Sequence, residues 1–299
     1  MRTTENSKST SQWKADFKEA IRSREQLETI LNTSIPDTGY PLFLPLPLVR
    51  KIKELGKDSP LWKQFIPSLE EEGSQGEVDP IGDHLHAKGS GIIHRYKNRL
   101  LFSPTEVCPV LCRYCFRKNE LNSESNLFKT SLSGLSRYLK FNKDVTEVIL
   151  TGGDPFFVSN SKIKSILDTI AEFEQIKYIR FHTRFPISIP SRFDTELLQI
   201  LNTSKKKILI AIHTNHIDEF SKESEAVIKK LSSLNISLLS QSVLLKGVND
   251  STADLKSLFT KFADLNIRPY YLHHPDQVRG AMHFYINLEA GREIYSKLR

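Results

Sequence analysis

Residues 99–115 read RLLFSPTEVCPVLCRYC, a short apolar run of β type that leads directly into three cysteines. Cys108, Cys112 and Cys115 follow the pattern C-x3-C-x2-C and are the only cysteines among 299 residues. An odd set within one short segment cannot pair completely as disulfides, and it is unlike the dispersed framework of a secreted protein. Soft thiolates this close together favour an iron-sulfur cluster, in which three cysteines bind three irons and the fourth iron is open to an added ligand.

The cysteines have two alternative roles that the motif alone leaves open. The thiols could join a histidine such as His94 in a zinc site, or they could be buried thiols without a metal. Both alternatives are weaker, because the spacing is specific and the three residues share one short loop. The clustering also indicates a reducing compartment, and we therefore expect the protein in the cytoplasm.

The chain around this motif alternates short β-rich runs with amphipathic helical stretches. In the helical stretches apolar residues recur at spacings of three and four, as in Ile163, Ile166, Leu167 and Ile170, so that each helix can bury one stripe against a sheet. The predicted strands are RLLFS, EVILT, KYIRFH, KILIAI, ISLLSQSVLL and RPYYLHH. Repeated strand-helix units predict an α/β fold whose parallel sheet curls into a partial or complete barrel.

Polar or glycine residues stand where these strands end. The carboxyl ends of parallel strands meet at one mouth of a barrel, so we expect these residues to lie together. They are Cys108 after the first strand, Gly152, Gly153 and Asp154 after the second, Thr183 and Arg184 after the third, His213 at the end of the fourth, Gln241 within the fifth and Asp276 after the sixth.

Residues 1–88 are predicted to form a helical accessory region, and residues 89–299 the barrel. The first part contains a helix around Trp13 to Leu31, a proline-interrupted stretch (YPLFLPLPLV) and a helix near Val49 to Leu55. The formal charge is +7, but the lysines and arginines are scattered, which indicates solvated helix faces and not a nucleic-acid footprint. No apolar run approaches the ~18 residues of a membrane-spanning helix, so we expect no membrane association.

With the motifs CPVLCRYC, TGGDPF and YYLHHPDQVRGAMHF, the sequence resembles the radical S-adenosylmethionine superfamily and, within it, the lysine 2,3-aminomutase family over residues 79–298. The most similar branch is the short form associated with modification of elongation factor P. The resemblance implies a partial (β/α)6 TIM-like barrel and an isomerase that converts α-lysine to β-lysine through a 5′-deoxyadenosyl radical and a pyridoxal phosphate aldimine. It also implies a [4Fe-4S] cluster, S-adenosylmethionine, pyridoxal 5′-phosphate and an external electron donor.

The resemblance further suggests which residues bind S-adenosylmethionine. The loop from Gly152 to Asp154 is similar to the loop that holds the methionine amino group, and Arg184 is the candidate for the methionine carboxylate. His213 and Gln241 match family positions near the nucleoside. Outside this context the same residues would indicate a structural turn, a surface salt bridge and a core histidine.

Other charged residues match the family's pyridoxal phosphate and substrate positions. Arg95, Tyr96 and Arg99 in HRYKNR correspond to residues that grip the phosphate of pyridoxal phosphate, as two guanidinium groups and a hydroxyl can do. Arg117 matches the position that receives the substrate α-carboxylate, and Asp276 matches one carboxylate for the lysine side-chain ammonium. Opposite charges at the two ends of the substrate would select amino acids of a particular length. Taken alone, Arg117 and Asp276 could each be an ordinary exposed charge.

The final residues depart from the family pattern. In the family, the lysine that binds pyridoxal phosphate lies in a C-terminal Gly-rich or Ser-Lys-Thr-Pro-like segment, whereas this sequence reads to Arg299 as a helix, LEAGREIYSKLR. Lys297 is not in a matching motif, and a second carboxylate for the substrate ammonium is missing. We expect either a truncated form of a longer protein or a variant that holds pyridoxal phosphate noncovalently. Two rival functions are an RNA-modifying radical enzyme, which the basic charge permits, and a noncatalytic relative.

Overall fold

A single seven-stranded sheet organises the computed structural model, which describes residues 9–121 and 126–298. Neighbouring strands follow chain order: β1 (Ile92–Tyr96), β2 (Arg99–Thr105), β3 (Glu147–Gly152), β4 (Tyr178–Thr183), β5 (Lys207–His213), β6 (Ile236–Val243) and β7 (Arg268–His273). The strands from β2 to β7 are parallel, and β1 pairs antiparallel with β2. The predicted partial (β/α)6 barrel is confirmed, and among the described residues β1 and β7 are its two edges.

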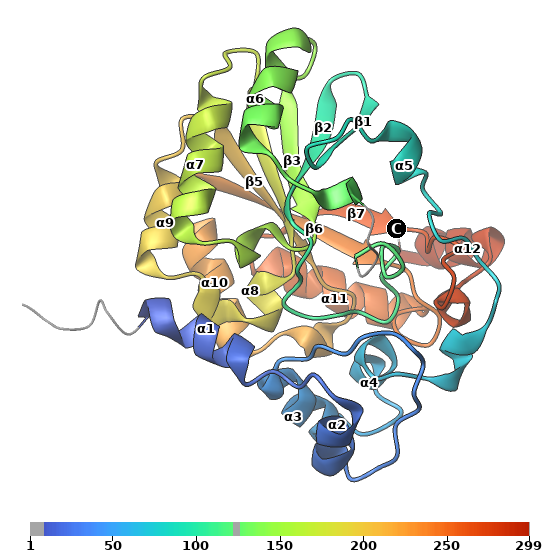
Figure 1. The fold of residues 1–299 in the computed structure, drawn as a ribbon. Coiled ribbons are helices and arrows are strands. Elements are labelled where there is room, and N and C mark those ends of the chain that lie inside the picture. Colours follow the sequence, from blue (N-terminus) through green and yellow to red (C-terminus); the bar gives the residue numbers. More distant parts are fainter. Residues whose placement is uncertain (1–8, 122–125, 299) are drawn as a thin grey trace, which may run out of the picture.

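Helices between the strands cover the outer face of the sheet (Figure 1). They are α6 (Leu132–Phe141), α7 (Asn160–Ala171), α8 (Phe185–Ser188), α9 (Thr195–Asn202), α10 (Lys222–Ser232) and α11 (Thr252–Asp264). A side chain caps the start of most of them, as Ser159 does for α7 by accepting a hydrogen bond from the Lys162 amide. The predicted apolar stripe of α7 is buried in the main core between helices and sheet. Packing of this stripe, more than helix propensity, holds α7 on the sheet.

β1 is a strand that the sequence prediction missed. No strand was predicted before residue 99, but Ile92–Tyr96 forms a hairpin with β2, pairing Ile92 with Phe102 and Tyr96 with Arg99. Only two adjacent isoleucines precede the charged residues, too few to show an alternating pattern. Residues 92–96 become a strand because they pair with the free edge of β2. The resulting hairpin places Arg95 and Arg99 on a rigid element.

The N-terminal region contains α1 (Ser9–Lys18), α2 (Arg24–Leu31), α3 (Leu46–Leu55) and α4 (Pro60–Phe65). The single helix predicted from Trp13 to Leu31 is therefore wrong, whereas the helix near Val49 to Leu55 is present. The break comes at Ile21, whose backbone pairs with that of Leu44, and Ser23 then caps α2. The backbone bridge at Ile21 and the capping by Ser23 therefore interrupt the helix, although the apolar residues have helical spacing.

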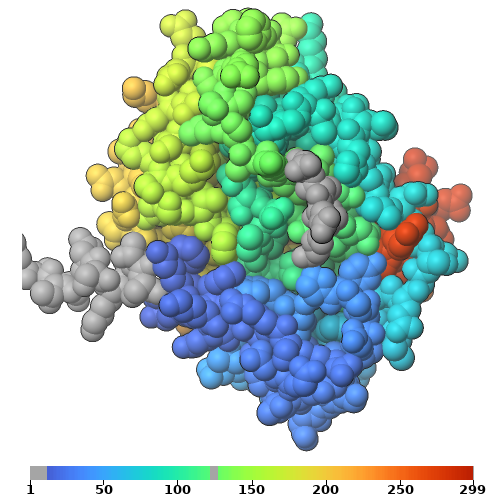
Figure 2. Space-filling model, in the orientation of Figure 1, coloured from blue at the N-terminus to red at the C-terminus, as the bar shows by residue number. Residues whose placement is uncertain are grey.

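The N-terminal region has its own apolar cluster but also packs on the barrel. Leu27, Leu44, Ile52 and Leu61 are fully buried in that cluster. Trp13 instead belongs to the main core and lies edge-on to Phe185 of α8. Figure 2 shows the two parts in contact along one side of the molecule. The proposed boundary near residue 88 stays a prediction.

The described residues contain two further helices and six 3-10 turns. They are α5 (Asp83–His86), α12 (Leu288–Leu298) and the 3-10 turns η1 (Leu69–Glu72), η2 (Asn126–Phe128), η3 (Pro155–Phe157), η4 (Pro190–Arg192), η5 (Ile217–Glu219) and η6 (Met282–Phe284). Among the described residues, no helix combines the length and apolarity that crossing a membrane requires.

Candidate active site

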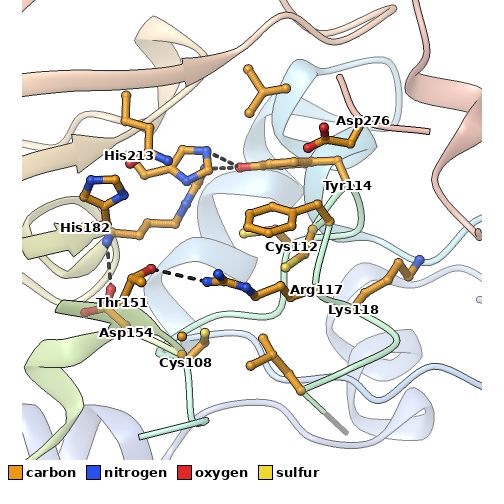
Figure 3. A pocket seen from close by; sticks show the side chains of 18 of the residues that line it. Cys108, Cys112, Tyr114, Arg117, Lys118, Thr151, Asp154, His182, His213 and Asp276 are labelled. Atoms are coloured by element: carbon orange, nitrogen blue, oxygen red, sulfur yellow. Dashed lines mark hydrogen bonds between the residues drawn. The ribbon is translucent and has the colours of Figure 1, made fainter. Parts of the chain in front are cut away.

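A cavity of about 700 Å³ opens at the carboxyl ends of the parallel strands. Figure 3 shows side chains from the cysteine loop and from several strand ends around it. Every residue that the sequence analysis assigned to the site lines this cavity. These residues are Arg95, Tyr96, Arg99, Cys108, Cys112, Cys115, Arg117, Gly152, Gly153, Asp154, Arg184, His213, Gln241 and Asp276.

Two glycines allow the end of β3 to lie against the segment that carries Cys108. The Gly153 amide donates to the Thr105 carbonyl at 2.9 Å, and a Cβ on Gly153 would lie 2.5 Å from backbone atoms of Glu106 and Val107. A Cβ on Gly152 would collide with Ser103 Oγ, at a residue with φ of +104°. The predicted close approach therefore exists, but its partner is the protein's own backbone. A role of these glycines toward a ligand stays a prediction.

The three thiols face the same cavity. Burial raises the pKa of Cys115 to about 11 and that of Cys108 well above its usual value, and neighbouring cysteines add to both effects. The metal-free thiols are therefore protonated at neutral pH. Thiolates form there when iron replaces the protons, and such a donor set of three sulfurs fits a [4Fe-4S] cluster.

The geometry does not assemble the alternative zinc site. His94 lies outside the cavity lining, with Nδ1 2.8 Å from the hydroxyl oxygen of Tyr138. Within residues 9–121 and 126–298, no three histidine, cysteine or acidic side chains converge as ligands of one metal ion.

Arg184 is held by a buried network at the end of β4. Its guanidinium donates to Glu219 of η5 and to the Tyr114 hydroxyl, while its Nε has no partner. The Tyr114 oxygen also lies 3.2 Å from His213 Nε2. Burial lowers the pKa of His213 well below its usual value, helped by Arg184, so the imidazole is neutral. Arg184 thus forms a buried ion pair and not a surface one, and one donor faces no protein acceptor.

Asp154 accepts hydrogen bonds from neighbouring strand ends. Thr183 Oγ1 donates to both of its oxygens at 2.8 and 2.9 Å, the Arg184 amide donates at 2.7 Å, and the Phe156 amide at 3.1 Å. Burial nevertheless raises the pKa of Asp154 to about 6. The carboxylate therefore joins β3 to β4, and its contact with a ligand ammonium stays a prediction.

Sequence reasoning missed Asp83, a buried carboxylate of α5 between two of the predicted arginines. Arg117 directs Nε and Nη2 at Asp83 Oδ2, at 3.0 and 2.8 Å, and Nη1 at Thr151 Oγ1, at 3.4 Å. Arg95 Nη2 lies 3.6 Å from Asp83 Oδ1, an oxygen that has no hydrogen-bond partner. Asp83 stands 34 residues before Arg117 in the chain, so no local spacing could have indicated the pair.

Asp276 lies at another side of the cavity, after β7. Burial raises its pKa, and the charge of Asp83 raises it further. The two carboxylates are therefore electrostatic neighbours. Asp83 is a second carboxylate in the cavity lining, but Arg117 engages it, so the absence of a second carboxylate for a substrate ammonium stays a prediction.

Several polar atoms in the cavity wall are buried without a protein partner. They are Arg99 Nε, Arg184 Nε, Gln241 Oε1 and His182 Nε2. Buried polar atoms are nearly always paired, so unpaired atoms on residues that line a cavity fit a site for polar ligands. Lys297 is elsewhere, on the exposed surface of α12, where its Nζ lies 2.6 Å from Glu293 Oε1.

Comparison with known proteins adds independent information. A family model described as a 4Fe-4S single cluster domain matches residues 88–227, which include all three cysteines. The L-lysine 2,3-aminomutase of Buchnera aphidicola is 37% identical over 287 residues, covering 92% of this chain and 84% of that protein. Its namesake from Haemophilus influenzae is 33% identical over 297 residues, covering 96% and 88%. A glutamate 2,3-aminomutase from Clostridioides difficile is 29% identical over 236 residues, covering 78% and 56%.

Proposed function

Since this chain belongs to the L-lysine 2,3-aminomutase family and is therefore a radical enzyme of the aminomutase class, we propose that it converts L-lysine to β-lysine. The observation that carries the choice of lysine is the position of Asp276 in the cavity that also contains the three cysteines and Arg117. An arginine and a carboxylate at different sides of one cavity suit an amino acid with a carboxylate at one end and an ammonium at the other.

In this proposal Cys108, Cys112 and Cys115 hold a [4Fe-4S] cluster. The cluster and S-adenosylmethionine supply one-electron chemistry, pyridoxal phosphate supplies a carbonyl for the migrating amino group, and an external donor supplies the electron. The unpaired atoms Arg184 Nε and Gln241 Oε1 support a polar ligand beside the cysteines.

The chain's own residues contribute binding and orientation. Arg117 lines the cavity and is fixed by Asp83, while its Nη1 lies 3.4 Å from Thr151 Oγ1; a substrate carboxylate would meet this preoriented guanidinium. Arg95 and Arg99 lie on the β1–β2 hairpin beside Tyr96, and we propose that they grip the phosphate of pyridoxal phosphate. The unpaired Nε of Arg99 supports this assignment.

The neighbouring substrate class is glutamate, because one relative bears that name. A glutamate side chain would place a second carboxylate toward Asp276, and like charges within a partly buried site repel. We therefore favour lysine. The use of β-lysine for modifying elongation factor P remains a proposal that rests on the resemblance of residues 270–284.

The test uses anaerobically reconstituted protein with its cluster verified beforehand. It is given lysine or glutamate together with S-adenosylmethionine, pyridoxal phosphate and a reductant, and the amino acids are followed by mass spectrometry. The proposal expects β-lysine and no β-glutamate. Protein with an intact cluster that cleaves S-adenosylmethionine but forms no β-lysine would contradict it and favour a noncatalytic or different role.

A further inference from the structure

The cysteine loop is clamped from behind by the N-terminal region. The Leu111 amide donates to the Phe43 carbonyl at 3.0 Å, and the Arg113 amide donates to the Gln64 carbonyl at 2.9 Å. The Arg113 side chain continues in the same direction and donates to the Pro41 carbonyl at 3.1 Å. The backbone that carries Cys112 is therefore attached to residues far away in the sequence.

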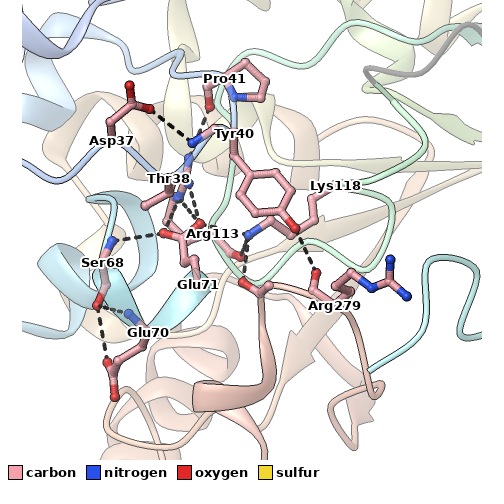
Figure 4. Close-up of polar contacts among 12 residues, drawn as sticks. Asp37, Thr38, Tyr40, Pro41, Ser68, Glu70, Glu71, Arg113, Lys118 and Arg279 are labelled. Atoms are coloured by element: carbon pink, nitrogen blue, oxygen red, sulfur yellow. Dashed lines mark hydrogen bonds and ion pairs between the residues drawn. The ribbon is translucent and has the colours of Figure 1, made fainter. Parts of the chain in front are cut away.

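A single buried carboxylate lies at the centre of this attachment (Figure 4). Glu71 of η1 is 2% exposed and receives hydrogen bonds from Arg113 Nε at 2.8 Å, Lys118 Nζ at 2.9 Å and the Ser68 amide at 3.0 Å. Burial alone would raise the pKa of Glu71, but Arg113 and Lys118 hold it below its usual value. Glu71 is therefore an anion within the protein interior, which requires such partners.

The two cations belong to the cysteine loop itself. Arg113 directly follows Cys112, and Lys118 stands three residues after Cys115. Lys118 acts electrostatically on Cys115. Both cations of the loop therefore meet the same carboxylate, Glu71.

The same group also reaches the segment that carries Asp276. Lys118 Nζ donates to the Gly280 carbonyl at 2.8 Å and lies 3.8 Å from the centre of the Tyr40 ring. Tyr40 Oη lies against Gly280, where a Cβ would collide with it, at a residue with φ of +78°. The N-terminal region, the cysteine loop and the segment after β7 thus meet at one buried charge cluster.

We propose that Glu71 is a positioning residue of the cysteine loop, which fixes the loop through Arg113 and Lys118 and sets the reduction potential of the cluster that the cysteines hold. The proposal rests on the proposed cluster site and not on the identity of the amino-acid substrate. Net charge and hydrogen bonding around an iron-sulfur cluster tune its potential. Removal of the Glu71 charge takes one negative charge away from the cysteine loop, which stabilises the added electron and makes the potential more positive.

The test compares Glu71→Gln with Glu72→Gln, an exposed glutamate of the same short helix, in anaerobically reconstituted full-length protein. Redox titration followed by electron paramagnetic resonance is expected to give a more positive midpoint potential for Glu71→Gln and the wild-type value for Glu72→Gln. Loss of outer-shell partners typically lowers metal affinity or activity about 10–100-fold, so iron retention against a chelator should also fall by about tenfold or more.

A charge-balanced variant separates electrostatics from simple damage. Glu71→Gln combined with Lys118→Met removes one negative and one positive charge, so the local net charge is unchanged and the potential should return toward the wild-type value. Lys118→Met alone should shift the potential in the negative direction, which keeps the test decisive if Glu71→Gln does not fold.

Folded Glu71→Gln or Lys118→Met protein with an unchanged potential would overturn the proposal. These measurements need neither lysine nor pyridoxal phosphate. A wild-type protein that carries a cluster but makes no β-lysine would therefore contradict the proposed function and leave this test intact.

Discussion

Two arginines of the cavity are held by the protein's own carboxylates before any ligand binds. Arg117 is engaged by Asp83, and Arg184 by Glu219. Each pair is buried, and a buried ion pair need not stabilise the fold, because both charges lose their hydration. The pair fixes the orientation of the guanidinium. In each arginine one further nitrogen does not bind the carboxylate. Nη1 of Arg117 lies near Thr151, and Nε of Arg184 has no protein partner.

Replacing Asp83 should therefore affect both folding and binding. In Asp83→Asn the buried Arg117 loses its counter-charge, and breaking such a pair destabilises proteins by about 3–5 kcal/mol. We expect a lower melting temperature and, in the folded protein, about a tenfold higher KM for lysine. Asp144→Asn is the matched control, because Asp144 pairs with Lys97 at 3.6 Å on the exposed surface. Equal effects of the two substitutions would contradict the role of Asp83.

His182 predicts the direction of one pH effect. Burial lowers its pKa to about 3, with help from Arg180, so it is neutral when folded and takes up a proton on unfolding below about pH 6.5. Its contribution to stability is complete above that pH and is lost as the pH falls toward 3. When the pH is lowered from about 7 to about 4.5, the free energy of unfolding of the wild type should fall. In His182→Gln this fall should be about 2 kcal/mol smaller.

Urea titrations at the two pH values measure that difference. Asp154, whose raised pKa has the opposite effect, is present in both proteins and does not enter the comparison. Identical pH dependence of the two proteins would show that His182 is not neutral and buried as described.

At the level of single residues, the sequence indicated the side chains but not their pairing. The cysteines, Arg117, Asp154 and Arg184 were recognisable because they stand in short motifs at strand ends. Asp83, Tyr114 and Glu219 act through contacts with residues 34, 70 or 35 positions away, and no periodic signal connects such positions. Their role follows only from the need of a buried arginine for a partner, which the tertiary structure satisfies.

At the level of elements, the junction between the ends of β2 and β3 decides where Cys108 lies. Gly153→Ala would place a Cβ within 2.5 Å of the backbone at Glu106 and Val107 and displace that segment. We expect about 1–3 kcal/mol lower stability and a smaller yield of reconstituted cluster. Gly73→Ala is the control, since a Cβ there meets only one atom, at 3.7 Å. Thermal unfolding and iron analysis of both variants test this, and a full cluster in Gly153→Ala would contradict it.

The elements show where sequence patterns are sufficient. The strands from β2 to β6 were predictable because each is an apolar run followed by a helix with a buried stripe, whereas β7, also predicted, has only exposed or half-buried side chains. β1 and the break between α1 and α2 were not, because both depend on pairing with a partner strand or bridge, Phe102 for Ile92 and Leu44 for Ile21. The propensity of a local segment does not reveal which distant residues it pairs with.

At the level of the whole molecule, the N-terminal region and the barrel share buried contacts through Trp13 and through Glu71 with Arg113. We expect them to unfold together. Both tryptophans lie in the N-terminal region, Trp62 within it and Trp13 at its contact with the barrel, so fluorescence reports that region and its contact while circular dichroism reports the whole chain. Coincident urea transitions are expected. An earlier fluorescence transition would show that the region before residue 88 is an independent unit.

The most direct measurement for the whole account is metal analysis of the anaerobically reconstituted protein and of Cys112→Ser. Wild-type protein should contain about four irons and four sulfides per chain and, after reduction, give the paramagnetic resonance of a [4Fe-4S] cluster that changes when S-adenosylmethionine is added. Cys112→Ser should lose that signal. Zinc in place of iron would contradict the assignment of this cavity as a radical active site. A cluster whose paramagnetic resonance signal does not change when S-adenosylmethionine is added would also contradict it.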